Sequence, residues 1–232
     1  MKRLSKYIAE TGYCSRRRAD DLIAEGKVTV NGARVTELPC LVTGDEDIRV
    51  EGKALTPLPK AYYKFYKPVG YVCSHNDKHN KTIYDYLGEE YSYLRYIGRL
   101  DKESEGLLIL TNDGGLVQRY THPSFEVSRS YEVTIDRELT IAEVNRLCQG
   151  VVDEGETLLC DAVEILREKR YIFHLHTGRK REIRRMVKQV GGKVLKLKRV
   201  RYGAVQLGKL RQGELTPLSD SEMDALFRKE RR

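Results

Sequence analysis

An aspartate lies in a short polar loop between two apolar segments, within the stretch YIGRLDKESEGLLILTNDGG at residues 96–115. Asp101 stands between Gly98 and Gly106, two positions after Arg99. Loops held by strands are where reactive side chains tend to sit. A carboxylate kept ionised by a nearby cation can act as a nucleophile or as a base. From composition alone, an acidic surface turn of Asp101, Glu103 and Glu105 is the simpler interpretation.

A second segment, GRKREIRRMVKQVGG at residues 178–192, combines an apolar stripe with a cluster of basic residues. Ile183, Met186, Val187 and Val190 recur at helical spacing, which predicts a helix with one buried face that ends at the glycine pair. The basic residues cannot all lie on that stripe, so most face solvent or a polyanion; they are Lys180, Arg181, Arg184, Arg185 and Lys188. Arg184 lies next to the edge of the apolar stripe. From such a position a guanidinium can donate two hydrogen bonds to a buried carboxylate. We interpret Lys188 as part of a solvated basic face and reject that interpretation for Arg184.

The basic surplus of the chain is concentrated in two places. The formal net charge is +8. Residues 1–34 carry a net charge of +4 and residues 178–202 a net charge of +10, which leaves the remainder acidic. Two separate basic segments suggest two contact surfaces for a polyanion such as RNA, with ordinary solvated surface charge as the alternative.

The N-terminal segment has the pattern of a compact helical module with a hairpin. Residues 3–11 and a second helix capped by Ser15 place apolar side chains at helical spacing. A short strand at residues 28–30 then turns at Asn31-Gly32. This order resembles the small RNA-binding module first known from a small-subunit ribosomal protein. The resemblance implies an RNA-binding domain at residues 1–52, whose basic contacts we expect to be Arg3, Lys6, Arg16, Arg17 and Arg18.

The rest of the chain reads as a linker followed by a larger domain. Residues 53–60 contain Pro57 and Pro59 without periodicity, which predicts a linker before a domain at 61–232. Strand patterns occur at residues 62–66, 107–111, 130–135, 162–166, 171–177 and 194–200, and helical patterns at 83–87, 116–120, 141–149 and 180–190. We therefore expect an α+β fold whose catalytic domain has a mixed, largely antiparallel sheet with flanking helices.

Four segments of this larger domain resemble the RsuA-type family of ribosomal RNA pseudouridine synthases. They are GRLDKESEGLLILTNDG, KFYKPVGYVCS, RSYEV and GRKREIRRM. Two positions depart from the family pattern: Tyr66 replaces an asparagine and Glu182 a glutamine. The turn-forming Lys67-Pro68 and Gly70 are intact, so the first departure puts little in doubt.

The resemblance implies isomerisation of uridine to pseudouridine in ribosomal RNA, on a nucleotide flipped out of its helix. Asp101 would be the catalytic carboxylate, Arg184 its cationic partner, and Tyr131 an aromatic ring that stacks on the uracil and takes part in proton transfer. Arg99 would fill the gap left by the nucleotide or hold a phosphate. Further RNA contacts are expected from Lys67, Arg179, Lys180, Arg181 and Arg185. The reaction oxidises nothing and adds nothing, so no cofactor is expected.

Other site types find little support. The five cysteines are scattered without a Cys-x-x-Cys pair, which argues against a disulfide framework or a zinc site. The fragments around His75, Asp77 and His79, and around His174 and His176, lack further ligand types, so no metal is expected. Neither a signal peptide nor an apolar run of membrane-spanning length is present. We expect a cytoplasmic monomer that meets no membrane and whose partner is ribosomal RNA or a ribosomal assembly particle.

Two alternatives remain open at this point. A non-catalytic RNA-binding assembly factor would share both basic segments, although it has no need for Asp101, Tyr131 and Arg184 together. A metal-dependent nuclease could use Asp101, Glu103 and Glu105, and its activity would depend on magnesium.

Overall fold

The computed structural model describes residues 1–121 and 126–228, which divide into two compact units. The first comprises Met1–Ala61 with Glu90–Leu94, and the second comprises Tyr62–Glu89 with the residues from Arg95 onward. None of the helices in the described ranges is long and apolar enough to cross a membrane.

The N-terminal unit packs two helices against short strands. α1 (Leu4–Glu10) and α2 (Arg16–Ala24) precede a four-stranded sheet of order β3-β2-β5-β6. Its strands are β2 (Val28–Val30), β3 (Ala33–Val35), β5 (Ile48–Val50) and β6 (Lys53–Ala54), while β1 (Lys2–Arg3) pairs with β4 (Leu41–Val42). The apolar side chains that recur at helical spacing in these two helices are buried: Leu4, Tyr7, Ile8, Ala19, Leu22 and Ile23. Ser15 caps α2 as expected, since its Oγ accepts a hydrogen bond from the Arg18 backbone N–H.

Both turns of this sheet use left-handed backbone. Asn31 and Gly32 have φ of 50° and 81°, as the Asn-Gly signal predicts for a two-residue hairpin turn. Glu51 and Gly52 have φ of 51° and 82° and form a second such turn between β5 and β6. The segment without regular structure therefore begins after Ala54, later than the linker start expected from the prolines. Glu-Gly is a weaker turn signal than Asn-Gly, and the sequence pattern did not reveal it.

The larger unit is built on one mixed sheet. Within the described residues the strand order is β13-β14-β10-β15-β9-β7-β17, with β8 paired to β9 and β16 to β15. β15 runs parallel to β9, and the other described pairings in this sheet are antiparallel. The bounds of its strands are β7 Tyr62–Lys67, β8 Arg95–Ile97, β9 Glu105–Thr111, β10 Arg129–Ile135, β13 Ala162–Arg167, β14 Arg170–Leu175, β15 Val194–Tyr202, β16 Val205–Gln206 and β17 Leu215–Pro217. The predicted α+β class with a mixed, largely antiparallel sheet is confirmed.

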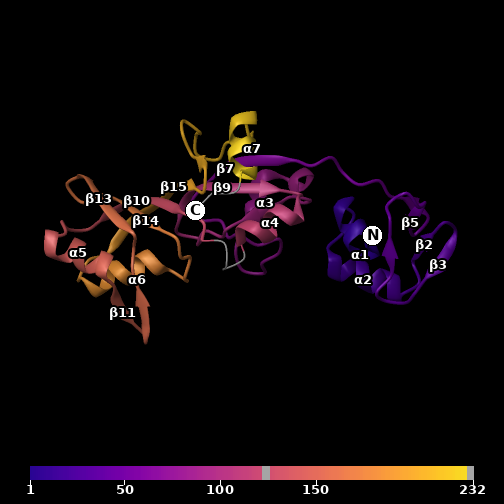
Figure 1. The fold of residues 1–232 in the computed structure, drawn as a ribbon, viewed down its shortest axis with the longest axis horizontal. Helices are drawn as coiled ribbons and strands as arrows, with labels where there is room; N and C mark the ends of the chain where they lie inside the picture. The colour runs from indigo at the N-terminus through magenta and orange to yellow at the C-terminus, as the bar shows by residue number, and fades with distance from the viewer. Residues whose placement is uncertain (122–125, 229–232) are drawn as a thin grey trace. The chain divides into compact units, whose positions relative to one another are not determined.

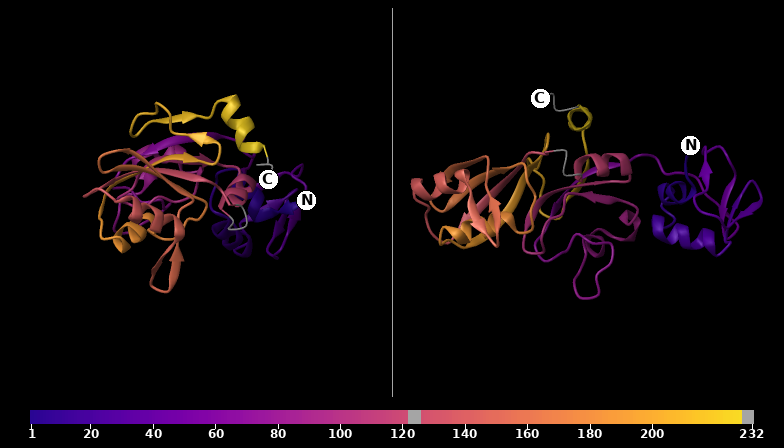
Figure 2. Two further views of the ribbon diagram at one scale, coloured as in Figure 1. Left: turned by 60° about the vertical axis from the view of Figure 1, so that its left-hand side comes forward. Right: turned by 60° about the horizontal axis from the view of Figure 1, so that its bottom comes forward.

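Helices flank each half of this sheet. α5 (Ile141–Gln149) and α6 (Glu182–Gln189) lie beside β14 in Figure 1, and α3 (Ile83–Leu87) and α4 (Gly114–Thr121) lie near β9. α7 (Asp220–Phe227) closes the described chain, and a hairpin of β11 (Val151–Asp153) and β12 (Glu156–Leu158) projects from the α5 and α6 side (Figure 2). The predicted apolar stripe of α6 is buried in the core: Ile183, Met186, Val187 and Val190. The strands and the α-helix of the larger unit that are absent from the sequence-based prediction are β8, β11, β12, β16, β17 and α7.

The parallel pairing of β9 with β15 requires a glycine. Gly106 has φ of +107°, and a Cβ built there would lie 2.3 Å from the Arg199 carbonyl oxygen. The register joins Gly106 to Arg199, so the loop that ends at β9 reaches the middle of the sheet. This places the Asp101 loop beside β15 and β10.

Candidate active site

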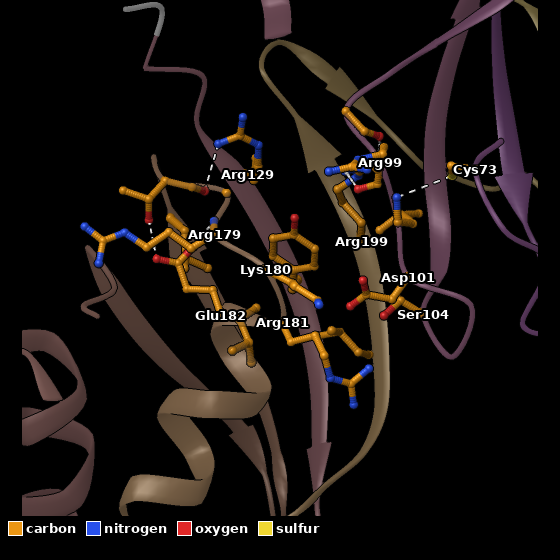
Figure 3. Close-up of a pocket in the computed structure, with 18 of the residues that line it drawn as sticks. Cys73, Arg99, Asp101, Ser104, Arg129, Arg179, Lys180, Arg181, Glu182 and Arg199 are labelled. Atoms are coloured by element: carbon orange, nitrogen blue, oxygen red, sulfur yellow. Dashed lines mark hydrogen bonds between the residues drawn. The ribbon is translucent and has the colours of Figure 1, made fainter. Parts of the chain in front are cut away.

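A cavity of about 650 Å³ opens where the Asp101 loop meets the centre of the sheet. Its walls come from the loop at residues 98–104, from β10 and β15, and from the segment that leads into α6 (Figure 3). Asp101 and Tyr131 both line it, 30 positions apart in the sequence. Leu175, Ile183 and Leu197 supply an apolar lining beside the tyrosine. The structure thus brings the predicted carboxylate and the predicted aromatic ring to one cavity.

Two buried cations hold the loop that carries Asp101. Nζ of Lys67, with no exposed surface, donates to the carbonyl oxygens of Asp101 at 3.2 Å and Ser104 at 2.7 Å. Burial lowers the pKa of Lys67 to about 8, partly countered by the Asp101 and Glu103 charges. Arg199, 1% exposed, donates to the carbonyls of Gly98 at 3.0 Å and Arg99 at 3.4 Å. Both cations act on backbone oxygens and position the loop.

Every carbonyl oxygen in the turn at residues 101–104 has a donor. The Asp101 oxygen also accepts from the Ser104 N–H, the Lys102 oxygen accepts from the Gly70 N–H at 2.8 Å, and the Glu103 oxygen accepts from Arg184 at 3.1 Å. Lys67 donates to the Ser104 oxygen, so the carbonyl groups of all four residues are held by hydrogen bonds. A turn anchored in this way presents its side chains without backbone reorganisation.

The Asp101 carboxylate itself is free of protein partners among the described residues, where no hydrogen bond or ion pair reaches it. The expected two-point contact with Arg184 is not formed. Nη1 of Arg184 donates to the Val194 carbonyl at 3.2 Å and Nη2 to the Glu103 carbonyl, so the guanidinium braces the turn from outside. Burial lowers the pKa of Arg184, and the charge of Arg181 adds to this, while Glu103 and Asp101 oppose it.

The exposed basic residues expected at the RNA surface form two groups. Arg99, Arg179, Lys180 and Arg181 are exposed and line the cavity, as Figure 3 shows. The N-terminal residues Arg3, Lys6, Arg16, Arg17 and Arg18 are exposed on their own unit. Arg18 forms an ion pair with Glu25, and Arg181 forms one with Glu103, each at 2.8–2.9 Å.

Two residues expected to contact RNA make their contacts inside the protein in this structure. Lys67 is fully buried, because its ammonium serves the turn rather than the surface. Arg185 is enclosed by the β11–β12 hairpin: its guanidinium donates to Asp153 at 2.5 Å and to Glu156 at 2.6 Å. These carboxylates raise the pKa of Arg185 and neutralise its charge. In both cases the positively charged group binds oxygen atoms of the protein that lie far away in the sequence.

Three residues of the site were missed by the sequence reasoning. Arg129 lines the cavity and donates to the carbonyls of His176 and Thr177; its position two residues before Tyr131 was an available signal. Arg199 lies two positions after Leu197, so both side chains point to the same face of β15, and both are buried. A charged residue on the apolar face of a predicted strand was the available signal. Ser104 is 1% exposed and lines the cavity, with no sequence signal of its own.

Glu182, the second departure from the family pattern, is buried and has defined partners. Its carboxylate accepts from the Thr177 hydroxyl at 2.7 Å and the Arg179 N–H at 3.0 Å. It therefore ties down the segment before α6, in which Arg181 has a left-handed φ of 52°.

The carboxylates of the nuclease hypothesis do not converge. Glu103 pairs with Arg181, and Glu105 accepts from the Tyr66 hydroxyl at 3.1 Å.

His174 and His176, considered above as a possible metal fragment, pair with Glu164 and Asp161. In the described parts of the chain, no group of three or more His, Cys, Asp or Glu side chains is arranged to hold a metal ion.

Comparison with known proteins identifies the family of the chain. Residues 61–189 match the family model of RNA pseudouridylate synthases. The chain belongs to the RNA pseudouridylate synthase family. Residues 2–46 of this pseudouridylate synthase also match the S4 domain. The segments that carry Asp101, Tyr131 and α6 all fall inside the first match.

Relatives of the synthase align over nearly its whole length. It is 36% identical to ribosomal large subunit pseudouridine synthase B of Bacillus subtilis, over 97% of this chain and 96% of that one. It is 35% identical to the dual-specificity RNA pseudouridine synthase RluF of Escherichia coli, over 97% and 78%. A crystal structure of a pseudouridylate synthase superposes with a TM-score of 0.70 and 31% identity, covering 97% of this chain and all of the other.

Proposed function

We propose that this enzyme isomerises specific uridines to pseudouridine in ribosomal RNA, with Asp101 as the catalytic carboxylate. One observation carries the assignment of Asp101. Its carboxylate lies in the cavity without a protein partner, on a turn whose four carbonyl oxygens are all held. A reactive group held by a rigid backbone and left unpaired for substrate is the arrangement that catalysis requires.

The chemistry conserves atoms and electrons. The bond between C1′ of the ribose and N1 of uracil breaks, the base rotates, and a bond from C1′ to C5 forms. The proton of C5 is lost and N1 gains one. An ionised carboxylate can attack or deprotonate the substrate in such a sequence. Tyr131 stacks on the rotating base, with Leu175 and Leu197 excluding water.

The cavity suits a single extruded nucleotide. Its volume of about 650 Å³ lies within the usual range for ligand pockets, and a base inside a helix could not reach Asp101. Arg99, Arg129, Arg179 and Lys180 surround the opening and supply phosphate contacts. Arg184 contributes by bracing the turn and by its positive charge near Asp101.

The S4 domain supplies a second RNA contact. Arg16 and Arg17 begin α2 and are exposed, beside Arg3 and Lys6 earlier in the chain. A tethered second contact raises the effective concentration of RNA at the cavity. The names of the relatives, which include a ribosomal large subunit enzyme, support ribosomal RNA or an assembly particle as the substrate. We place this activity in the cytoplasm, carried out by a monomer away from membranes.

The decisive experiment compares the wild type with Asp101→Asn on ribosomal RNA transcripts and on ribosomal particles lacking the modification. Release of tritium from uridine labelled at C5 reports the reaction, and filter binding verifies that both proteins bind RNA equally. We expect product from the wild type alone, without added metal or cofactor. Tight binding with no product from either protein, on every substrate offered, would instead identify a non-catalytic assembly factor. Activity that depends on magnesium and cleaves the RNA would identify a nuclease.

A further inference from the structure

A buried hydroxyl with no hydrogen-bond partner lies in the same turn as the Asp101 carboxylate. Ser104 is 1% exposed, and its Oγ is one of the few buried side-chain polar atoms without a partner in the described part of the chain. Buried hydroxyls are almost always hydrogen-bonded, because leaving one unpaired costs free energy. An unpaired one inside an active site therefore calls for a functional explanation.

The turn itself offers this hydroxyl no acceptor. The carbonyl oxygens of residues 101–104 are already engaged by Lys67, Arg184 and two backbone N–H groups. The Asp101 carboxylate is an acceptor that still lacks a donor, and it lies three positions away in the same turn, whose Ser104 N–H donates to the Asp101 carbonyl. Both side chains line the cavity, where Figure 3 draws them. The turn thus presents both an unpaired donor and an unpaired acceptor.

A hydrogen bond from Ser104 to the Asp101 carboxylate becomes more important when a nucleotide enters the cavity. Water solvates the carboxylate while the cavity is open, and a base filling the cavity displaces that water. A carboxylate that loses water requires donors from the protein to stay ionised and oriented. Because the turn is held at every carbonyl, the two side chains and the Ser104 hydroxyl are the parts left to adjust.

We propose that Ser104 is a positioning residue for the isomerisation: once uridine fills the cavity, its hydroxyl donates to the Asp101 carboxylate and orients the reacting oxygen. This inference rests on the proposed function. It assigns the Ser104 hydroxyl no contact with the substrate, so its effect falls on the chemical step and leaves RNA affinity unchanged.

The test measures single-turnover rates of tritium release at saturating RNA with full-length variants. Ser104→Ala should slow the chemical step by about 10- to 100-fold, since a hydrogen bond to a charged group is lost. RNA affinity should stay within about twofold, and the thermal unfolding midpoint should not fall, because the deleted hydroxyl has no partner in the free protein. Ser104→Thr, which keeps the hydroxyl, should restore the rate to within about threefold of the wild type.

A matched control separates the role of Ser104 from the general loss of a buried hydroxyl. Oγ1 of Thr216, on β17, is also buried without a partner and does not line the cavity, so Thr216→Val should leave the rate unchanged. Ser104→Cys, with a similar shape and a weaker donor, should react at a rate between those of Ala and Thr.

Some outcomes would overturn the inference. A Ser104→Ala rate within about twofold of wild type would do so, as would Thr and Ala variants that are equally slow, which would make side-chain shape the cause. Either result with an active wild type leaves the proposed function intact. A wild type that produces no pseudouridine on any ribosomal RNA overturns the proposed function and this inference together.

Discussion

Nζ of Lys67 lies 2.7 Å from the carbonyl oxygen of Ser104 and 3.2 Å from that of Asp101, so one buried ammonium contacts both ends of the turn at residues 101–104. It also donates to the Pro68 carbonyl at 3.0 Å. Three backbone oxygens without other side-chain donors thus depend on a single residue at the end of β7. Removing this residue should disturb catalysis without touching the RNA surface.

Lys67→Met should lower the free energy of unfolding by about 2–4 kcal/mol, since it leaves buried carbonyls unpaired, and should abolish most activity. Chemical denaturation and tritium release at matched RNA binding would measure the two effects. A variant as active as the wild type would show that catalysis does not need the hydrogen bonds from Lys67 to the turn.

Lys67 should also leave a signature in the pH dependence of stability. Its pKa is lowered to about 8 in the fold, from an ordinary value of 10.5, so the unfolded state binds more protons between these values. The stability difference between wild type and Lys67→Met should therefore shift in favour of the wild type as pH rises from about 8 to about 10.5. Urea unfolding of both proteins at pH 7.5 and pH 10 tests this sign. Taking the difference in unfolding free energy between the two proteins removes the contributions of the other titrating groups. A constant difference would contradict the lowered pKa.

Gly106→Ala should be among the most destabilising small substitutions in the protein. The new Cβ would lie 2.3 Å from the Arg199 carbonyl oxygen at a φ of +107°, so both sterics and backbone conformation oppose it. We expect a loss of about 3 kcal/mol or more. Gly114→Ala is the control: Gly114 begins α4 with open space around its Cβ position, and its stability should be unchanged or slightly higher.

We predict two separable contributions from Tyr131, base stacking by its ring and proton transfer by its hydroxyl. Tyr131→Phe keeps the ring and should retain RNA affinity and much of the base stacking, with a loss in the chemical step of about 10²-fold if the hydroxyl transfers a proton. Tyr131→Leu should lose the stacking as well and be slower still. Equal rates for wild type and Phe would restrict the role of Tyr131 to stacking.

Lys180 and Arg185, on the same segment, should behave in opposite ways. Lys180 is exposed at the cavity, so Lys180→Ala should weaken RNA binding and reduce its salt dependence by about one unit of slope, without loss of stability. Arg185 is held by Asp153 and Glu156, so Arg185→Ala should lower the stability of the protein and leave the salt slope unchanged. RNA titrations at several salt concentrations, together with urea unfolding, would distinguish these outcomes.

Arg16 and Arg17 test the role of the S4 domain. Replacing both with alanine should weaken RNA binding several-fold to tenfold at physiological salt and leave the single-turnover rate at saturating RNA unchanged. Lys53→Ala, an exposed basic residue on β6, is the control on the same unit. Unchanged affinity in the double variant would remove these arginines from the RNA surface.

The sequence by itself determined the residue types of the site, its family and most of the larger elements. Local periodicity accounts for the buried stripe of α6, and turn chemistry for the Asn31-Gly32 hairpin, because both depend on neighbours a few positions apart. The motif around Asp101 also depends on close neighbours, and the structure places that residue in the cavity.

Only the tertiary structure decided what several charged side chains do. Lys67 and Arg185 look like surface cations in the sequence, yet one clamps a turn and the other is enclosed by a hairpin. Arg199 reaches the carbonyl of Gly98, 101 positions away, because β15 pairs in parallel with β9. No local pattern encodes which strands pair across such separations. Whether a cation meets a phosphate, a carboxylate or a buried carbonyl is therefore settled by packing.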